Sequence, residues 1–162
     1  MSALPYELCS ALLATADAFL RESQRLFRPL GLTGAQFNVL NILAAGAAAG
    51  MSQRELGDRL VVDRSNVTGL LDRLEKARLV QRKDDPADRR IYLVSLTTAG
   101  RKVWEKAHPL YLAALAQVTE GLSARQMRDC LETLRKLEAG ASRWTPVKAA
   151  RSPALGKRGA AR

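Results

Sequence analysis

A run of small polar and basic side chains just after Asp63 could bind nucleic acid. Its members are Arg64, Ser65, Asn66, Thr68 and Gly69. Serine, threonine, asparagine and arginine form hydrogen bonds with base edges and phosphates, and one arginine can contact a guanine through two of them. The alternative for these residues alone is an ordinary solvated helix face, on which Asn66 completes the N-terminal cap with Asp63.

A second candidate lies farther along the chain, where Asp88 and Arg90 stand two positions apart. Residues two apart in an extended segment share a face, so the aspartate can orient the arginine through an ion pair. An arginine held at a hairpin tip has the right shape for a narrow, strongly negative minor groove. Three further basic residues are expected to lie near the flanking phosphates: Arg89, and Arg82 and Lys83 of the preceding strand.

Helical periodicity and capping residues predict the elements that must position these side chains. The first helix covers residues 5–30, and further helices begin at the caps Thr33, Ser52, Asp63, Thr97 or Thr98, and Ser123. Between two of them the period falls from near four to two, over residues 79–83 and 91–96. An Asp-Pro turn separates these two runs, which predicts a β-hairpin.

The order helix, short helix, helix, hairpin is that of a winged helix-turn-helix. The short helix supports the next one, whose apolar stripe packs inward while its polar face enters a major groove. Gln53 and Arg54 open the supporting helix and could donate to the DNA backbone. Arg73 is a further phosphate candidate, with a salt-bridged surface as its alternative. The predicted fold is therefore mainly α with a small β-hairpin wing (α+β).

Two longer runs resemble the MarR family of bacterial winged helix-turn-helix transcription regulators. They are LVVDRSNVTGLLDRL at residues 60–74 and DPADRRIYLVSLTTAG at residues 85–100, where Asp-x-Arg precedes Leu-Thr-x-x-Gly. The resemblance covers roughly residues 5–139 in element order. One departure is Arg78, which stands where the family usually has glycine, and a left-handed helix cap there would cost arginine roughly 1 kcal/mol more than glycine.

The resemblance implies a homodimer that binds a pseudo-palindromic operator in double-stranded DNA. It implies a DNA-binding region over residues 33–97 and a helical dimerisation region over residues 5–32 and 98–139. It also implies a ligand-responsive cleft between the two regions. The expected function is that of a repressor released by a small-molecule effector.

Four residues are candidates for lining that cleft: Phe37, Trp104, His108 and Tyr111. Aromatic residues at helical spacing are more often plain core, and a lone histidine such as His108 is more often structural than a ligand. Pro109 should bend its helix and bias His108 away from helical angles. No cluster of cysteine, histidine and carboxylate has metal-ligand spacing, so we expect no metal and no cofactor.

Cys9 is a candidate redox site, because its position resembles that of the reactive cysteine in the hydroperoxide-sensing branch of the family. In that branch tyrosines hydrogen-bond the cysteine, whereas Leu13 and Ser23 occupy the aligned positions here. Cys130 lies on an apolar stripe and is expected to pack in the core. A redox-responsive regulator is therefore kept as an alternative to one that senses a small molecule.

The charge of the chain suggests an anionic partner but does not choose one. Its 26 basic and 16 acidic residues give +10, yet residues 51–92 hold ten basic and eight acidic residues, a balance of only +2. Residues 141–162 form a basic tail without acidic residues, predicted to be flexible. Its basic residues are Arg143, Lys148, Arg151, Lys157, Arg158 and Arg162. A sequence-independent architectural DNA-binding protein that uses this tail is the alternative from another class.

Other classes of protein fit the sequence poorly. Two cysteines are no disulfide framework, and the first residues show no secretory signal, so a cytoplasmic protein is expected. No apolar stretch reaches the roughly 18–20 residues that span a bilayer, so we expect no membrane partner. No nucleophile, base and orienting group assemble, so we expect no enzyme.

Overall fold

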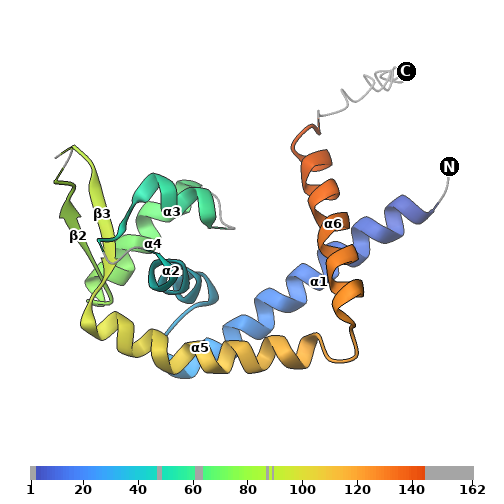
Figure 1. Ribbon diagram of the computed structural model, residues 1–162, viewed down its shortest axis with the longest axis horizontal. Helices are drawn as coiled ribbons and strands as arrows, with labels where there is room; N and C mark the ends of the chain where they lie inside the picture. The colour runs from blue at the N-terminus through green and yellow to red at the C-terminus, as the bar shows by residue number, and fades with distance from the viewer. Residues whose placement is uncertain (1–2, 47–48, 61–63, 87, 89, 145–162) are drawn as a thin grey trace, which may run out of the picture. The chain divides into compact units, whose positions relative to one another are not determined.

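The structure is a computed structural model that describes residues 3–46, 49–60, 64–86, 88 and 90–144. It has two compact units, Met1–Val118 and Thr119–Arg162. The elements of the first unit are α1 Leu4–Phe27, the 3₁₀ turn η1 Arg28–Leu30, α2 Gly34–Ala45, β1 Met51–Ser52, α3 Gln53–Arg59, α4 Arg64–Lys76, β2 Val80–Asp84, β3 Tyr92–Leu96 and α5 Thr98–Val118. The second unit contains α6 Ala124–Ala141 (Figure 1). In the part of the chain that is described, no helix combines the length and apolarity needed to cross a membrane.

Capping boxes begin three of the helices, at the residues that the sequence predicts. The side chain of Thr33 accepts from the Gln36 backbone N–H, and the Gln36 side chain accepts from the Thr33 backbone. The same reciprocal pair begins α3 at Ser52 and α6 at Ser123. Each pair satisfies two backbone donors that have no partner within the helix, so the helix starts are fixed by local sequence. The predicted cap at Asp63 lies outside the described residues.

The predicted hairpin is the main part of an antiparallel sheet with strand order β1-β3-β2. Its register pairs Val80 with Leu96 and Asp84 with Tyr92, within one residue of the expected strands. β1 was not expected. Its two residues, Met51 and Ser52, pair with Val94 and Leu93. A strand this short carries no periodicity that would show it in the sequence.

A single apolar core holds the first unit together. Leu40, Leu56, Leu71, Leu74 and Val94, from three helices and a strand, are all fully buried in it. The predicted inward stripe of α4 is confirmed at Val67, Leu70, Leu71 and Leu74, whereas Ala77 is exposed because the helix ends before it. The core therefore fixes which face of α4 is left to solvent.

The turn after α4 contains a residue in the left-handed conformation. That residue is Arg78, the position at which the sequence departs from the family pattern. Arg78 has φ 58°, the one non-glycine residue with positive φ among those described. Its N–H donates to the Glu75 carbonyl at 2.8 Å, and the Leu79 N–H donates to the Leu74 carbonyl at 2.9 Å. These are the two hydrogen bonds of a Schellman motif, in which glycine is the usual residue at this position. Arginine here holds a conformation that costs it more than it would cost glycine.

The glycine of the Leu-Thr-x-x-Gly run has a packing role. A Cβ added to Gly100 would lie 1.9 Å from the carbonyl oxygen of Leu79, so only glycine permits this approach. Thr97 accepts from the Gly100 N–H at 2.9 Å and donates to the Arg78 carbonyl at 2.7 Å. The motif thus joins the start of α5 to the turn that follows α4, and it settles the choice of cap in favour of Thr97.

The long helices differ from expectation in two respects. α5 contains Pro109 and continues through it to Val118, and His108 is helical, so the expected bias of His108 away from helical angles is wrong. In α6 no described residue is buried, and Leu131, Leu134 and Cys130 are exposed. The prediction that Cys130 packs in a core is therefore wrong, because the apolar stripe of α6 is exposed in the part of the chain that the structure describes.

Candidate nucleic-acid interface

The polar residues of α4 lie on the opposite face from its buried stripe. Asn66, Thr68, Gly69 and Arg73 are exposed. Arg64 begins the helix, while its side chain and that of Ser65 lie outside what is described. The helix therefore offers an accessible polar face of the kind that a major groove admits.

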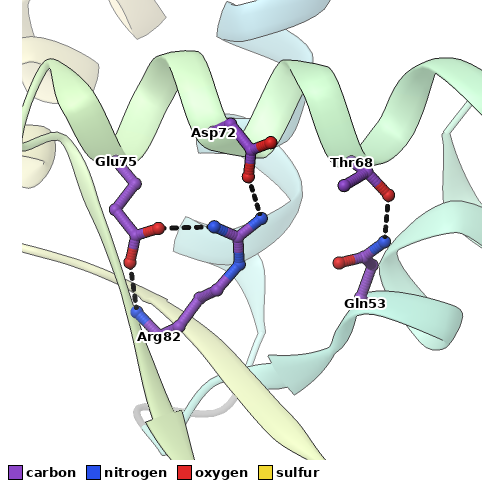
Figure 2. A network of polar contacts seen from close by, with 5 residues as sticks. All are labelled: Gln53, Thr68, Asp72, Glu75 and Arg82. Atoms are coloured by element: carbon purple, nitrogen blue, oxygen red, sulfur yellow. Dashed lines mark hydrogen bonds and ion pairs between the residues drawn. The ribbon is translucent and has the colours of Figure 1, made fainter.

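Two of the predicted DNA-contacting residues are bonded to each other. The Gln53 side-chain amide, at the start of α3, donates to the Thr68 hydroxyl of α4 at 2.7 Å (Figure 2). Arg54, beside Gln53, is exposed. The capping box keeps the start of α3 in place. The hydrogen bond from the Ser52 backbone N–H lowers the pKa of Glu55, which favours the charged carboxylate in this box.

The wing pair has the geometry that the spacing predicts. Arg90 donates through Nε to Asp88 Oδ1 at 3.0 Å and through Nη2 to Oδ2 at 2.9 Å, a two-point contact. The Arg90 backbone N–H also donates to Asp88 Oδ1 at 3.0 Å. These side-chain and backbone hydrogen bonds lower the pKa of Asp88, and the side-chain bonds raise the pKa of Arg90. The Arg90 side chain is nevertheless 89% exposed, so its cation is oriented and remains accessible. Arg89 lies outside the described residues.

Arg82 has a different role from the one expected of it. Its guanidinium donates to Asp72 Oδ1 at 2.7 Å and to Glu75, both on α4 (Figure 2). Desolvation by partial burial acts to lower the pKa of Arg82, but the hydrogen bonds to the two carboxylates outweigh it and raise the pKa. Its Nη atoms thus donate to the protein, which does not support the expectation that Arg82 lies ready for a flanking phosphate. Lys83, the next residue, is exposed as expected.

The four candidates for the effector cleft lie in different surroundings. Phe37 is buried and stacks on Phe27 with ring centroids 4.1 Å apart, so of the two interpretations kept for it, core packing and cleft lining, the structure supports core packing. Tyr111 lines an open groove of about 460 Å³ between α1 and α5, together with Phe19, Leu26 and Leu115. The groove is mostly apolar, and Glu22 and Arg25 are the charged residues that line it.

Trp104 and His108 lie together on another part of α5. Their ring centroids are 4.8 Å apart, and the Trp104 indole N–H donates to Asn41 Oδ1 of α2 at 3.1 Å. Neither residue lines the groove at Tyr111. The Nδ1 atom of His108 is buried, with no hydrogen-bond partner among the described residues.

Cys9 is an exposed residue of α1, a helix that spans Leu4–Phe27. Leu13, one turn later, is also exposed. The described residues contain no group of three or more histidine, cysteine, aspartate or glutamate side chains that could hold a metal ion. Redox sensing by Cys9 stays a prediction.

Comparison with known proteins gives one consistent result. A sequence model described as the MarR family matches residues 30–91. The transcriptional activatory protein BadR of Rhodopseudomonas palustris is 36% identical over 124 residues, which cover 75% of this chain and 71% of that protein.

Solved structures agree with the sequence match. A mutant MarR of Escherichia coli, complexed with operator DNA, is 30% identical with a TM-score of 0.73, over 83% of this chain and 96% of that one. CouR of Rhodococcus jostii RHA1, bound to p-coumaroyl-CoA, is 28% identical with a TM-score of 0.71, over 91% of this chain and all of that one (100%).

The named relatives are transcriptional regulators rather than enzymes. The two solved structures share the fold of this chain, which is mainly helical with a small antiparallel sheet. The chain therefore belongs to the MarR family of winged-helix transcriptional regulators.

Proposed function

We propose that this chain is a homodimeric regulator that binds a specific pseudo-palindromic operator in double-stranded DNA. The observation that carries the proposal is the pairing, within one compact unit, of an exposed polar face on α4 with an arginine held by Asp88 at the wing. α4 enters the major groove with Arg64, Ser65 and Thr68 toward the bases. Arg90 enters the neighbouring minor groove, where an oriented cation is favoured by groove width rather than by base identity.

The surrounding residues hold the protein in register on the duplex. The residues that contact phosphates are Gln53, Arg54, Arg73 and Arg89. Asn66 and Gly69 lie along the edge of the polar face of α4. Hydrogen bonds to phosphate position a protein on DNA without selecting a sequence. The MarR structure bound to operator DNA supports this assignment through its fold and its 30% identity.

Dimerisation supplies the symmetry that a palindromic site requires. The proposed dimer region combines residues 5–32 and 98–139, which include the exposed apolar side chains Leu13 and Leu20 of α1 and Leu131 of α6. Groups of exposed apolar side chains on a surface mark interaction sites, and a second copy would cover these. Two copies of α4 then face two half-sites about one turn of DNA apart.

A small molecule that releases the operator is the proposed trigger. The groove beside Tyr111 is large enough for a ligand and is mostly apolar, and CouR is a neighbour bound to p-coumaroyl-CoA. Trp104 and His108 are the remaining candidates for contact with the effector. We propose repression as the outcome, although BadR is named an activatory protein, so a reporter assay must score both directions.

The charge of residues 141–162 favours a second candidate, sequence-independent binding as an architectural protein. Six basic residues without an acidic one would bind any duplex by counterion release. An architectural protein binds cognate and random duplexes alike, whereas a regulator separates them by about 10³ or more.

Selection of duplexes from a random library by the purified full chain tests the proposal. A palindromic consensus is the expected result, and Arg90→Ala should weaken binding of the selected duplex by about 1–3 kcal/mol. The matched control is Lys76→Ala, because Lys76 is also an exposed basic residue of the DNA-binding region and is assigned neither a DNA contact nor a place in the dimer region. An unselected pool, or equal losses for the two variants, would contradict the proposed mechanism.

A further inference from the structure

Arg82, on strand β2 of the wing, is ion-paired to α4, the helix proposed to enter the major groove. We infer that Arg82 is a positioning residue, which sets α4 relative to the hairpin and so contributes to sequence selectivity without touching DNA. The inference rests on the proposed DNA-binding function. It assigns a role to a residue that sequence reasoning had placed among the phosphate contacts.

The contact between Arg82 and α4 has three points. Nη2 donates to Asp72 Oδ1 at 2.7 Å, Nη1 donates to Glu75 Oε2, and the Arg82 backbone N–H donates to Glu75 Oε1 at 3.3 Å. The Arg82 side chain is 21% exposed, whereas those of Asp72 and Glu75 are 58% and 41% exposed. Arg82 is therefore the more buried partner, and the two carboxylates of α4 lie nearer the surface.

Strand register explains why Arg82 points at α4. Arg82 pairs with Val94 of β3, so the two side chains share a face of the sheet, and Val94 is completely buried. Val80, two residues earlier on the same face, is buried as well. Lys83 lies on the other face, because side chains alternate along a strand. Core packing thus aims Arg82 inward and leaves Lys83 for solvent.

The same face of α4 is held at a second point. Thr68, Asp72 and Glu75 follow each other at helical spacing, and Figure 2 shows Gln53 and Arg82 approaching them along one side of the helix. Gln53 comes from α3 and Arg82 from β2. A helix bonded in this way to two separate elements has little freedom to roll or slide relative to the wing.

This geometry requires the fork of arginine. A guanidinium presents several N–H donors in one plane and can serve two carboxylates at once, whereas a lysine ammonium is a point charge on a flexible stem. The hairpin that begins with β2 also carries the Asp88–Arg90 pair. The orientation of α4 and the placement of the wing arginine are therefore set together, and a major-groove and a minor-groove contact can be made in one register.

Three variants of the full chain separate positioning from charge. Arg82→Met removes one positive charge, the double variant Asp72→Asn with Glu75→Gln removes two negative charges, and Arg82→Lys keeps the charge without the fork. Lys83→Met is the matched control, since it removes one positive charge from the outer face of the same strand. The probes are the duplex selected from the random library by the wild-type chain and a scrambled duplex of the same composition.

The expected result is a lower ratio of selected to scrambled affinity in Arg82→Met and in the double variant, by about 5-fold or more in each. Affinity for the scrambled duplex should change in opposite directions, weaker in Arg82→Met and tighter in the double variant, because it follows charge. Arg82→Lys should fall between Arg82→Met and wild type. Lys83→Met should weaken both duplexes and leave the ratio unchanged.

Three results would overturn the inference: an unchanged ratio in folded Arg82→Met and in the folded double variant, ratios that move in opposite directions, or full recovery by Arg82→Lys. Melting temperature and helical circular dichroism establish folding, and the double variant is informative even where Arg82→Met does not fold. A wild-type chain that does not prefer its selected duplex would overturn the proposed function instead, so the two failures are distinguishable.

Discussion

Replacing Arg78 with glycine should stabilise the protein, and the structure allows the size of the effect to be worked out. The left-handed conformation at φ 58° costs a residue with a Cβ about 1–2 kcal/mol. Glycine escapes this cost but gains freedom in the unfolded chain, which returns about 0.4–1 kcal/mol. The net gain expected for Arg78→Gly is therefore about 0.5–1 kcal/mol in the free energy of unfolding, or about 2 °C in Tm.

The substitution leaves the hydrogen bonds of the turn in place. All three involve the backbone of the turn: the Arg78 N–H to Glu75, the Leu79 N–H to Leu74, and the Arg78 carbonyl that accepts from Thr97. The Arg78 side chain is exposed, so no buried contact is lost with it. The backbone conformation is the feature that changes in energy.

Urea unfolding of the full chain at one fixed protein concentration measures this effect, since oligomers shift their midpoint with concentration. Arg78→Ala removes the same side chain but keeps a Cβ, so it should give no gain. Arg73→Gly, within α4, should lose about 1 kcal/mol because glycine is unfavourable inside a helix. The reasoning is refuted if Arg78→Gly is no more stable than wild type, or if Arg78→Ala stabilises as much.

Three further predictions concern other parts of the chain. Gly100→Ala should cost about 1–3 kcal/mol in unfolding free energy, because the new Cβ meets the Leu79 carbonyl. Gly69→Ala should stabilise α4 instead, because its added Cβ meets no atom of another described segment within 4 Å, and equal effects would contradict the packing argument. The lowered pKa of Glu55 means that its contribution to stability is present above its unfolded pKa and is lost as pH falls through the lower folded value. Glu55→Gln keeps the capping box without the titration, so its stability should fall less than that of wild type between about pH 5 and pH 3; parallel pH profiles would count against this. Deleting residues 145–162 removes five basic residues and should flatten the salt dependence of DNA affinity while operator preference stays, as binding at several salt concentrations would show; loss of preference would make the tail part of the recognition surface.

Local patterns allowed much of the fold to be predicted from the sequence. Capping boxes at Thr33, Ser52 and Ser123 need only four neighbouring residues each, and the Asp88–Arg90 pair needs only three. Such contacts are encoded by spacing, so they could be inferred before any packing was known.

Contacts between distant segments could not be predicted in the same way. Arg82 was assigned to a phosphate because nothing local to β2 indicates that Asp72 and Glu75 lie within reach. Phe37 stayed a candidate for the cleft because helical spacing does not distinguish a core ring from a ligand contact, and its stacking on Phe27 places it in the core. β1 is too short to carry a pattern, and its pairing depends on β3, about forty residues later.

The ratio of dissociation constants for the selected duplex and a scrambled duplex of the same composition tests the central claim most directly. It should be measured with the full chain at one near-physiological salt concentration, because both constants depend strongly on salt. A recognition helix and a clamped wing arginine predict a ratio of about 10³ or more. A ratio near one would contradict the account and would favour binding by charge alone.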